Sequence, residues 1–252
     1  MKNRLEYKYL VSTMYLEKLR TSLLGYLDYD DYASIRPSKE YTVRSIYLDS
    51  FDYKCYYEKL DGIHTRKKLR IRGYNQKEEN PRVFFEIKRK NDNFVSKDRA
   101  RVPIQDIRKT LRGSNSVTQL DDEEKKYLNN FFFYYQLRHL EPKVLVVYER
   151  EPFQCKFGSH LRVTIDKNLR SKVVYDYDML FDEEGLTGGN RKEFILEIKF
   201  YQVLPQWIDK VIGEFDLTRI AVSKYTSCID MQHRFSISLN KSIRNDFDYR
   251  IQ

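Results

Sequence analysis

The sequence predicts an α+β protein built on a closed, mostly antiparallel β-barrel of about eight strands, with a charged interior and helices on its outside. Most strand-like segments follow one another along the chain, so neighbouring strands can pair in sequence. Seven of these segments alternate one apolar face with one charged face. Several helices need apolar surfaces to pack on, and the apolar strand faces supply them, so the charged faces are expected to point inward.

The first half of the chain supplies the larger part of the strands. Alternating or β-branched and aromatic residues predict strands at residues 5–11, 41–50, 64–75, 81–91 and 96–104. Leucines at helical spacing from Leu16 to Leu27 predict a helix within residues 12–30, with Ser12 or Thr13 as its cap. A short helix is expected after residue 104, ending at Gly113.

The second half of the chain adds strands and three further helices. Strands are expected at residues 142–153, 160–169 and 193–200. Helices are expected at about residues 121–139, from Pro205 to Phe215, and within residues 221–235. No shift in composition marks a second domain, so we expect one domain at residues 1–235 and a polar tail at residues 236–252.

The charge balance favours anionic partners. The 252 residues include 46 Lys and Arg against 37 Asp and Glu, a formal net charge of +9. The chain has no glycine-rich phosphate-binding motif, so side chains would have to hold any phosphates. Three cysteines without a C-x-x-C spacing indicate a reducing compartment, and no apolar run is long enough for a signal peptide or a transmembrane segment. We therefore expect a cytoplasmic protein.

The charged strand faces are the feature that points to a function. They comprise Glu6 and Lys8; Arg70 and Arg72; Glu86, Lys88 and Lys90; Lys97, Arg99 and Arg101; Tyr148 and Arg150; Arg162, Thr164 and Asp166; and Glu197 and Lys199. For any single strand a solvated face is the simpler interpretation, because Glu–Lys pairs across strands are common there. Seven faces dominated by Arg and Lys favour a channel that holds a linear chain of phosphates, with a few carboxylates for a metal ion. Cations crowded in such a channel would strain the empty protein.

An ordered set of segments resembles one known family. "RLEYKY", "KLRIRGY", "FFEIKRK", "VVYEREPF", "LRVTID", "ILEIKF" and "SKY" are similar to segments of the VTC domain. This is the polyphosphate polymerase domain of the vacuolar transporter chaperone complex, in the CYTH-like triphosphate tunnel metalloenzyme superfamily. The resemblance runs from about Arg4 to Met231, and the whole ordered set is more specific than any one of its motifs.

The resemblance implies roles for individual residues. The cations expected to act on the transferred phosphate are Arg70, Arg72, Lys88, Arg150 and Lys199. Those expected to bind the rest of the substrate are Lys8, Lys97, Arg99, Arg162, Ser223 and Lys224, and the strand faces add Lys90 and Tyr148. Glu197 is expected to hold Mn²⁺ or Mg²⁺, with Glu6 and Glu86 as the other candidate ligands.

The implied activity is an ATP-dependent polyphosphate polymerase, whose partners are ATP and inorganic polyphosphate or triphosphate. Two alternatives stay open: a metal-dependent triphosphatase or tripolyphosphatase of the same fold, and a non-catalytic binder of polyphosphate or RNA. The triphosphatase branch of the superfamily begins with E-x-E-x-K, whereas Arg4 replaces the first Glu here. One metal-binding carboxylate fewer fits phosphate transfer better than hydrolysis. We expect no nucleic-acid partner, because packing explains the many tyrosines better than base stacking does.

Overall fold

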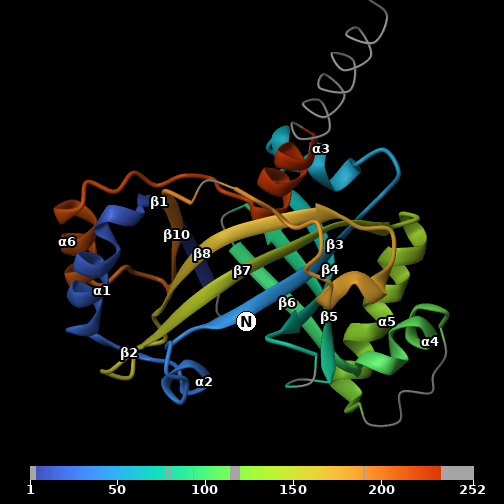
Figure 1. The fold of residues 1–252 in the computed structure, drawn as a ribbon, viewed down its shortest axis with the longest axis horizontal. Helices are drawn as coiled ribbons and strands as arrows, with labels where there is room; N and C mark the ends of the chain where they lie inside the picture. The colour runs from blue at the N-terminus through green and yellow to red at the C-terminus, as the bar shows by residue number, and fades with distance from the viewer. Residues whose placement is uncertain are drawn as a thin grey trace, which may run out of the picture.

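Ten strands form one antiparallel sheet in the computed structural model, which describes residues 4–233 except 78, 80, 93, 114–119 and 190 (Figure 1). The strands are β1 (Arg4–Ser12), β2 (Leu27–Tyr29), β3 (Tyr41–Asp49), β4 (Thr65–Tyr74), β5 (Arg82–Asn91), β6 (Phe94–Pro103), β7 (Glu141–Cys155), β8 (Arg162–Val173), β9 (Thr187–Gly188) and β10 (Glu193–Tyr201). This confirms the predicted α+β class and the antiparallel pairing.

Eight of the strands follow one another in a ring. The order of pairing is β7-β3-β4-β5-β6-β1-β10-β8, and β8 pairs in turn with β7, from Val144↔Val173 to Gln154↔Arg162. The short strands β2 and β9 pair with β7 and β8 outside this ring. Because side chains alternate along each strand, the ring has one face toward its inside and one toward the helices.

The helices lie around the ring, with two pairs of them on opposite sides. They are α1 (Leu16–Leu24), α2 (Asp31–Ser34), α3 (Lys54–Leu60), α4 (Ile107–Leu111), α5 (Asp122–Leu137) and α6 (Gln206–Glu214), with 3₁₀ turns η1 (Thr13–Tyr15), η2 (Ile104–Asp106) and η3 (Tyr177–Phe181). Figure 1 shows α1 and α6 together on one side of the strands and α4 and α5 on the other. Residues 224–233 are also helical. No helix in the described part of the chain has the length and apolarity needed to cross a membrane.

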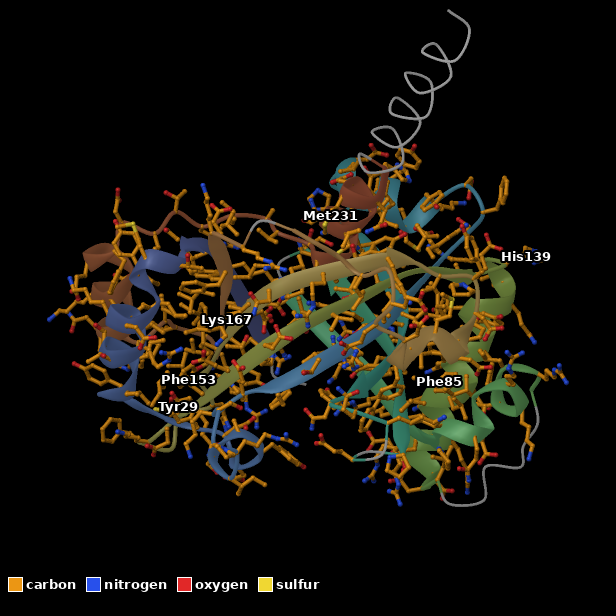
Figure 2. All side chains as sticks on the ribbon, in the orientation of Figure 1. Tyr29, Phe85, His139, Phe153, Lys167 and Met231 are labelled. Atoms are coloured by element: carbon orange, nitrogen blue, oxygen red, sulfur yellow. The ribbon has the colours of Figure 1, made fainter. Side chains whose placement is uncertain are left out.

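The outer strand faces form the hydrophobic core. Phe131 of α5 packs edge-on against Phe85 of β5, with ring centroids 5.0 Å apart, and Figure 2 shows Phe85 on that side of the molecule. On the other side, Leu19 of α1 and Ile208 of α6 share a buried cluster with Ile198 of β10. The apolar half of each alternating strand is therefore taken up by helix packing, as the sequence predicted, and the charged half faces the other way.

Four short elements, α2, α3, β2 and β9, have no counterpart in the sequence-based prediction. The helix expected within residues 12–30 ends at Leu24, and Leu27 belongs to β2, where it pairs with Cys155 of β7. The residues after Gly25 pair with β7 and do not continue the helix, so strand pairing outweighs the helical spacing of the leucines. Helix α3 had no predicted counterpart; Asp49 at the end of β3 accepts hydrogen bonds from the amides of Cys55 (2.8 Å) and Tyr56 (3.0 Å) at its start. The predicted tail at residues 236–252 lies outside the described residues.

The helical residues 224–233 pack against part of the inner face of the ring. Tyr225, Cys228 and Ile229 form a buried cluster with Val43 of β3 and Val146 of β7. The hydroxyl of Tyr225 also donates a hydrogen bond to Asp49. The inner face is therefore apolar where this helix lies and charged elsewhere.

Candidate active site

The charged strand faces line one cavity of about 810 Å³ inside the ring. All eight strands of the ring contribute side chains, and residues 219–225 cover part of it. Seventeen Lys and Arg side chains reach the cavity, against three Asp and Glu. This excess makes the cavity a site for a compact, highly charged anion.

Fifteen of the sixteen predicted site residues lie on the cavity. They are Glu6, Lys8, Arg70, Arg72, Lys88, Lys90, Lys97, Arg99, Tyr148, Arg150, Arg162, Glu197, Lys199, Ser223 and Lys224. Glu86 is the exception, because its side chain is fully buried behind the cations that surround it. The two-residue alternation of strands thus brings together residues from positions 6 to 199, and the segment around the start of the last helix adds Ser223 and Lys224.

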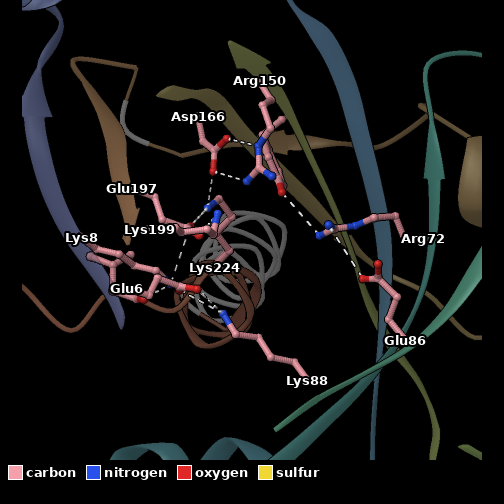
Figure 3. Close-up of polar contacts among 12 residues, drawn as sticks. Glu6, Lys8, Arg72, Glu86, Lys88, Arg150, Asp166, Glu197, Lys199 and Lys224 are labelled. Atoms are coloured by element: carbon pink, nitrogen blue, oxygen red, sulfur yellow. Dashed lines mark hydrogen bonds and ion pairs between the residues drawn. The ribbon is translucent and has the colours of Figure 1, made fainter. Parts of the chain in front are cut away.

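Two carboxylates face the cavity from neighbouring strands. The pairing of β1 with β10 places Glu6 opposite Lys199 and Lys8 opposite Glu197. The Lys8 ammonium lies 3.0 Å from Glu6 and 4.0 Å from Glu197, and Lys88 donates to Glu6 over 3.0 Å (Figure 3). Burial alone would raise the pKa of both carboxyl groups, but the nearby ammonium groups hold each pKa below its usual range. Both side chains are therefore ionised.

Glu86 of β5 neutralises four cations from the two neighbouring strands, β4 and β6. Its carboxylate lies 2.7 Å from Arg70, 2.9 Å from Arg99, 3.3 Å from Lys97 and 3.8 Å from Arg72. Burial would raise the pKa of Glu86, yet the guanidinium groups of Arg70 and Arg72 keep that pKa well below its usual value. This position suits a structural counter-ion that fixes the arginines in place.

Asp166 of β8 orients two further cations. It accepts two parallel hydrogen bonds from Arg150, at 2.7 and 2.8 Å, and its other neighbour is the Lys224 ammonium at 2.6 Å (Figure 3). Burial would raise the pKa of Asp166, but Arg150 and Lys224 bring it to about 2. The sequence places Asp166 on a charged face, but its role as a partner of Arg150 depends on the pairing of β7 with β8.

Carboxylates neutralise more of the cavity cations than the sequence alone indicated. The strain expected from crowded cations is relieved in the central region, where Glu6, Glu86, Asp166 and Glu197 each contact two or more of them. The reason is that the strand faces were considered singly, whereas opposite charges meet across neighbouring strands.

Some lysines still lose proton affinity through their burial in the cavity. Burial, together with neighbouring cations, lowers the pKa of Lys68 and of Lys97 to about 7 and that of Lys199 to about 8. Lys68 was missed among the predicted site residues. It lies two residues before Arg70 on the same face of β4, so extending the alternation by one step would have found it.

One end of the cavity carries cations without carboxylate partners. Among the described residues, no carboxylate forms an ion pair with Lys59, Arg66, Lys68, Lys90 or Arg219, and all five line the cavity. Lys68 instead donates to the hydroxyl of Ser223 over 3.0 Å. Lys59 lies on α3 and Arg219 in the segment before the last helix, and neither belongs to an alternating strand that could have revealed it.

The donor set suits a divalent cation only with help from a bound anion. Among the described residues, no group of three or more His, Cys, Asp and Glu side chains could hold a metal ion. Glu6 and Glu197 share Lys8 and could supply one or two oxygen ligands. Mg²⁺ is commonly held by one or two carboxylates together with substrate phosphates. The residues present therefore fit a metal ion that binds along with phosphates.

Comparisons with known proteins agree with this geometry. The family model described as the VTC domain matches residues 3–233, which include every residue that the structure describes. A solved structure of a proposed adenylate cyclase from Bacillus halodurans has the same fold, with a TM-score of 0.50 and 13% identity over 88% of this chain and 94% of that one. A second proposed adenylate cyclase, from Vibrio parahaemolyticus, has a TM-score of 0.45 and 10% identity over 91% of this chain and 98% of that one. No curated protein matches the chain.

Proposed function

The chain belongs to the VTC domain family, and on that premise we propose that it is a polyphosphate polymerase, which transfers the γ-phosphate of ATP to the end of an inorganic polyphosphate chain. Its triphosphate tunnel fold supports a phosphotransferase or triphosphatase. The observation that carries the proposal is the cavity inside the ring, where seventeen cations from many strands face three acidic side chains. The ring would act as a tunnel through which a line of phosphates passes.

Positioning and charge neutralisation account for most of the catalysis of phosphate transfer. An oxygen of the terminal phosphate of the chain forms a bond to the γ-phosphorus of ATP, the bond from that phosphorus to the β,γ-bridging oxygen breaks, and ADP leaves with the electron pair. Arg70, Arg72 and Arg150 would hold the phosphates in line, because Glu86 and Asp166 already fix their guanidinium groups. Lys88 and Lys199 would neutralise charge on the transferred group.

The acceptor in this reaction needs no general base. A terminal phosphate oxygen is already anionic, unlike a water molecule or a hydroxyl group. In keeping with this, the cavity lining in the described part of the chain contains no histidine. A site made of cations therefore suits transfer between phosphates.

Enzymes of this fold family depend on a divalent metal ion, and Glu197 and Glu6 are the residues that would hold it. We propose Mn²⁺ or Mg²⁺, which when bound would neutralise phosphate oxygens and ease the departure of ADP. The Lys8 ammonium forms ion pairs with both carboxylates, so it offsets their mutual repulsion and holds them close together before phosphates and metal bind.

Hydrolysis is the main competing reaction, and Arg4 argues against it. Arg4 lines the cavity two residues before Glu6 on the same strand face, where a second carboxylate would otherwise stand. A cation at this position favours the binding of another phosphate. A carboxylate there would instead help to hold a metal ion that activates water. Transfer to phosphate is therefore the reaction that we propose.

Incubation with ATP, Mn²⁺ and a short phosphate primer tests the proposal. We expect ADP to form together with phosphate chains that lengthen with time on a gel. ADP and orthophosphate in equal amounts, without longer chains, would show a triphosphatase instead. Binding of polyphosphate without any turnover in Mn²⁺ or Mg²⁺ would show a non-catalytic binder.

A further inference from the structure

An aromatic surface forms one end of the cavity. We call it the aromatic mouth and define it as Tyr32, Ile35, Tyr41, Tyr74 and Phe84, all of which line the cavity. Tyr41 is the first residue of β3 and Tyr74 the last of β4, so these rings lie where the strands of the ring end. Tyr32 belongs to α2 and Ile35 follows it directly.

Three of the rings form a continuous packed set. The ring centroids of Tyr41 and Tyr74 are 5.7 Å apart, and those of Tyr74 and Phe84 are 5.6 Å apart, both in edge-to-face geometry. The guanidinium carbon of Arg99 lies 3.7 Å from the centre of the Phe84 ring. These contacts hold the rings in place without a bound ligand.

The other two residues of the aromatic mouth are exposed although they line the cavity. Tyr32 is 76% exposed and Ile35 is 81% exposed. Tyr32 makes no ring contact with another described residue. Two large, exposed side chains that line the same cavity as the packed aromatic rings offer further surface for a flat, uncharged ring.

The opposite end of the cavity has a different chemistry. There Lys59, Arg66, Lys68, Lys90 and Arg219 lie without carboxylate partners in the described chain. Such cations are best satisfied by phosphates, and an uncharged base would leave them unpaired. The aromatic end of the cavity therefore suits the base of a nucleotide, and the cationic end suits phosphates.

We propose that the aromatic mouth binds the nucleobase of the triphosphate substrate, with its phosphates directed into the cavity. The inference rests on the proposed function and adds the site and orientation of the nucleoside. Tyr74 lies two residues beyond Arg72 on the same strand face, about 7 Å along β4. That separation matches the ribose that stands between the base on the aromatic mouth and an α-phosphate within reach of Arg72, so that the β- and γ-phosphates lie deeper in the cavity.

Stacking of this kind selects a flat ring more than a particular base. Every base presents a π face, and each stacked base contributes about 1–3 kcal/mol, which corresponds to a fivefold to hundredfold change in the dissociation constant. The nucleotide should therefore bind more tightly than its phosphates alone would.

The test compares ATP with inorganic tripolyphosphate, which has the phosphates without the nucleoside. The variant Tyr32→Ser with Ile35→Ser removes the exposed part of the aromatic mouth without opening the core. Dissociation constants are measured in EDTA, so that metal-dependent turnover does not occur. We expect the variant to lose at least fivefold in affinity for ATP and less than twofold for tripolyphosphate. The matched control, Tyr175→Ser with Val203→Ser, removes side chains that are 84% and 79% exposed and lie away from the cavity, and should change neither.

The outcomes separate this inference from the proposed function. If wild type binds both ligands and the variant keeps its ATP affinity, or loses affinity for both ligands equally, the nucleoside site is wrong and the proposed function stands. If wild type fails to bind tripolyphosphate, both proposals fall. Photolabelling with 8-azido-ATP gives a second readout. Labelled peptides from residues 30–41 or 74–84 support the aromatic mouth, and labelling confined to the peptides of Lys59 and Arg219 overturns it.

Discussion

Glu86 and Glu197 occupy similar places in the sequence and different places in the structure. Each belongs to an alternating strand and each follows the pattern Glu-x-Lys. Glu197 reaches the cavity and contacts lysines, whereas Glu86 is fully buried among arginines and lysines behind the cavity surface. Residues that look equivalent along the chain therefore differ in their surroundings: Glu197 is open to the cavity, where we propose that it holds the metal ion, and Glu86 is a buried counter-ion.

Substitution of Glu197 tests this difference. We expect Glu197→Gln to weaken activation by Mn²⁺ by about 10- to 100-fold, because it removes a metal-binding oxygen while it keeps the shape of the side chain. Glu86→Gln is the matched control and should lower thermal stability with little change in the Mn²⁺ concentration needed for half activity. Activity and Mn²⁺ titration of both purified variants give the answer. Near-normal activation of Glu197→Gln would make Glu6 the next candidate ligand.

Three lysines should take up protons when the anion binds. Burial and nearby cations disfavour the charged forms of these lysines, so the pKa of Lys68 and of Lys97 is about 7 and that of Lys199 is about 8. A bound polyanion favours the charged forms and raises these pKa values. At pH 8 binding therefore takes up protons, and affinity for tripolyphosphate should fall as the pH rises from 7 to 9.

Calorimetry in buffers of different ionisation enthalpy, such as HEPES and Tris, measures this uptake. Lys68→Arg keeps a charge that does not titrate in this range, so the number of protons taken up should decrease. An apparent binding enthalpy that is the same in both buffers would contradict the prediction.

At the scale of elements, β4 and β5 depend on one buried charge network. Arg70 and Arg72 on β4 contact Glu86 on β5, and removal of both arginines leaves that carboxylate with Lys97 and Arg99 alone. Loss of partners for a buried charge destabilises a protein by up to about 3–5 kcal/mol, here reduced by the remaining partners. We therefore expect Arg70→Ala with Arg72→Ala to melt below wild type in phosphate-free buffer.

The additional change Glu86→Gln provides the control for this prediction. It removes the stranded charge, so the triple variant should regain part of the lost melting temperature. A double variant that melts as high as wild type would mean that the network does not stabilise the strand pair. Differential scanning calorimetry of the three proteins makes the comparison.

The sequence predicted elements well where a period of two or 3.6 residues was sustained. The charged faces of β4, β5 and β10 lie on the cavity because alternation fixes the side of a strand that a residue occupies. The sequence alone could not predict which carboxylate contacts which cation, because these contacts depend on the register between neighbouring strands. Helix α3 was missed for a related reason: its start is stabilised by Asp49 of β3, and a seven-residue helix leaves little periodic signal.

At the scale of the whole molecule, the ring should be stabilised by the anion that it binds. A ligand that binds only the folded state contributes about 2.7 kcal/mol at a hundredfold excess over its dissociation constant. We expect tripolyphosphate to raise the melting temperature well above the effect of sodium chloride at equal ionic strength. The Arg70→Ala, Arg72→Ala variant should lose most of this increase. Equal shifts with both salts would contradict an anion site inside the ring.

The distribution of charge has a consequence for how the protein behaves in separation and in mixtures. The residues that line the cavity carry a net charge of +14, while the whole chain carries +9, so all other residues together carry −5, of which the buried Glu86 and Asp166 account for −2. The isoelectric point of about 9.2 therefore describes the interior more than the outside. We therefore expect the protein to bind a cation-exchange column more weakly than its isoelectric point suggests. We also expect no mobility shift with duplex DNA at 0.15 M salt, because a large polyanion meets the acidic exterior first. Tight binding of duplex DNA would contradict this prediction. A slender phosphate chain can enter the ring and reach the cavity cations, which are closed to a resin bead or a double helix.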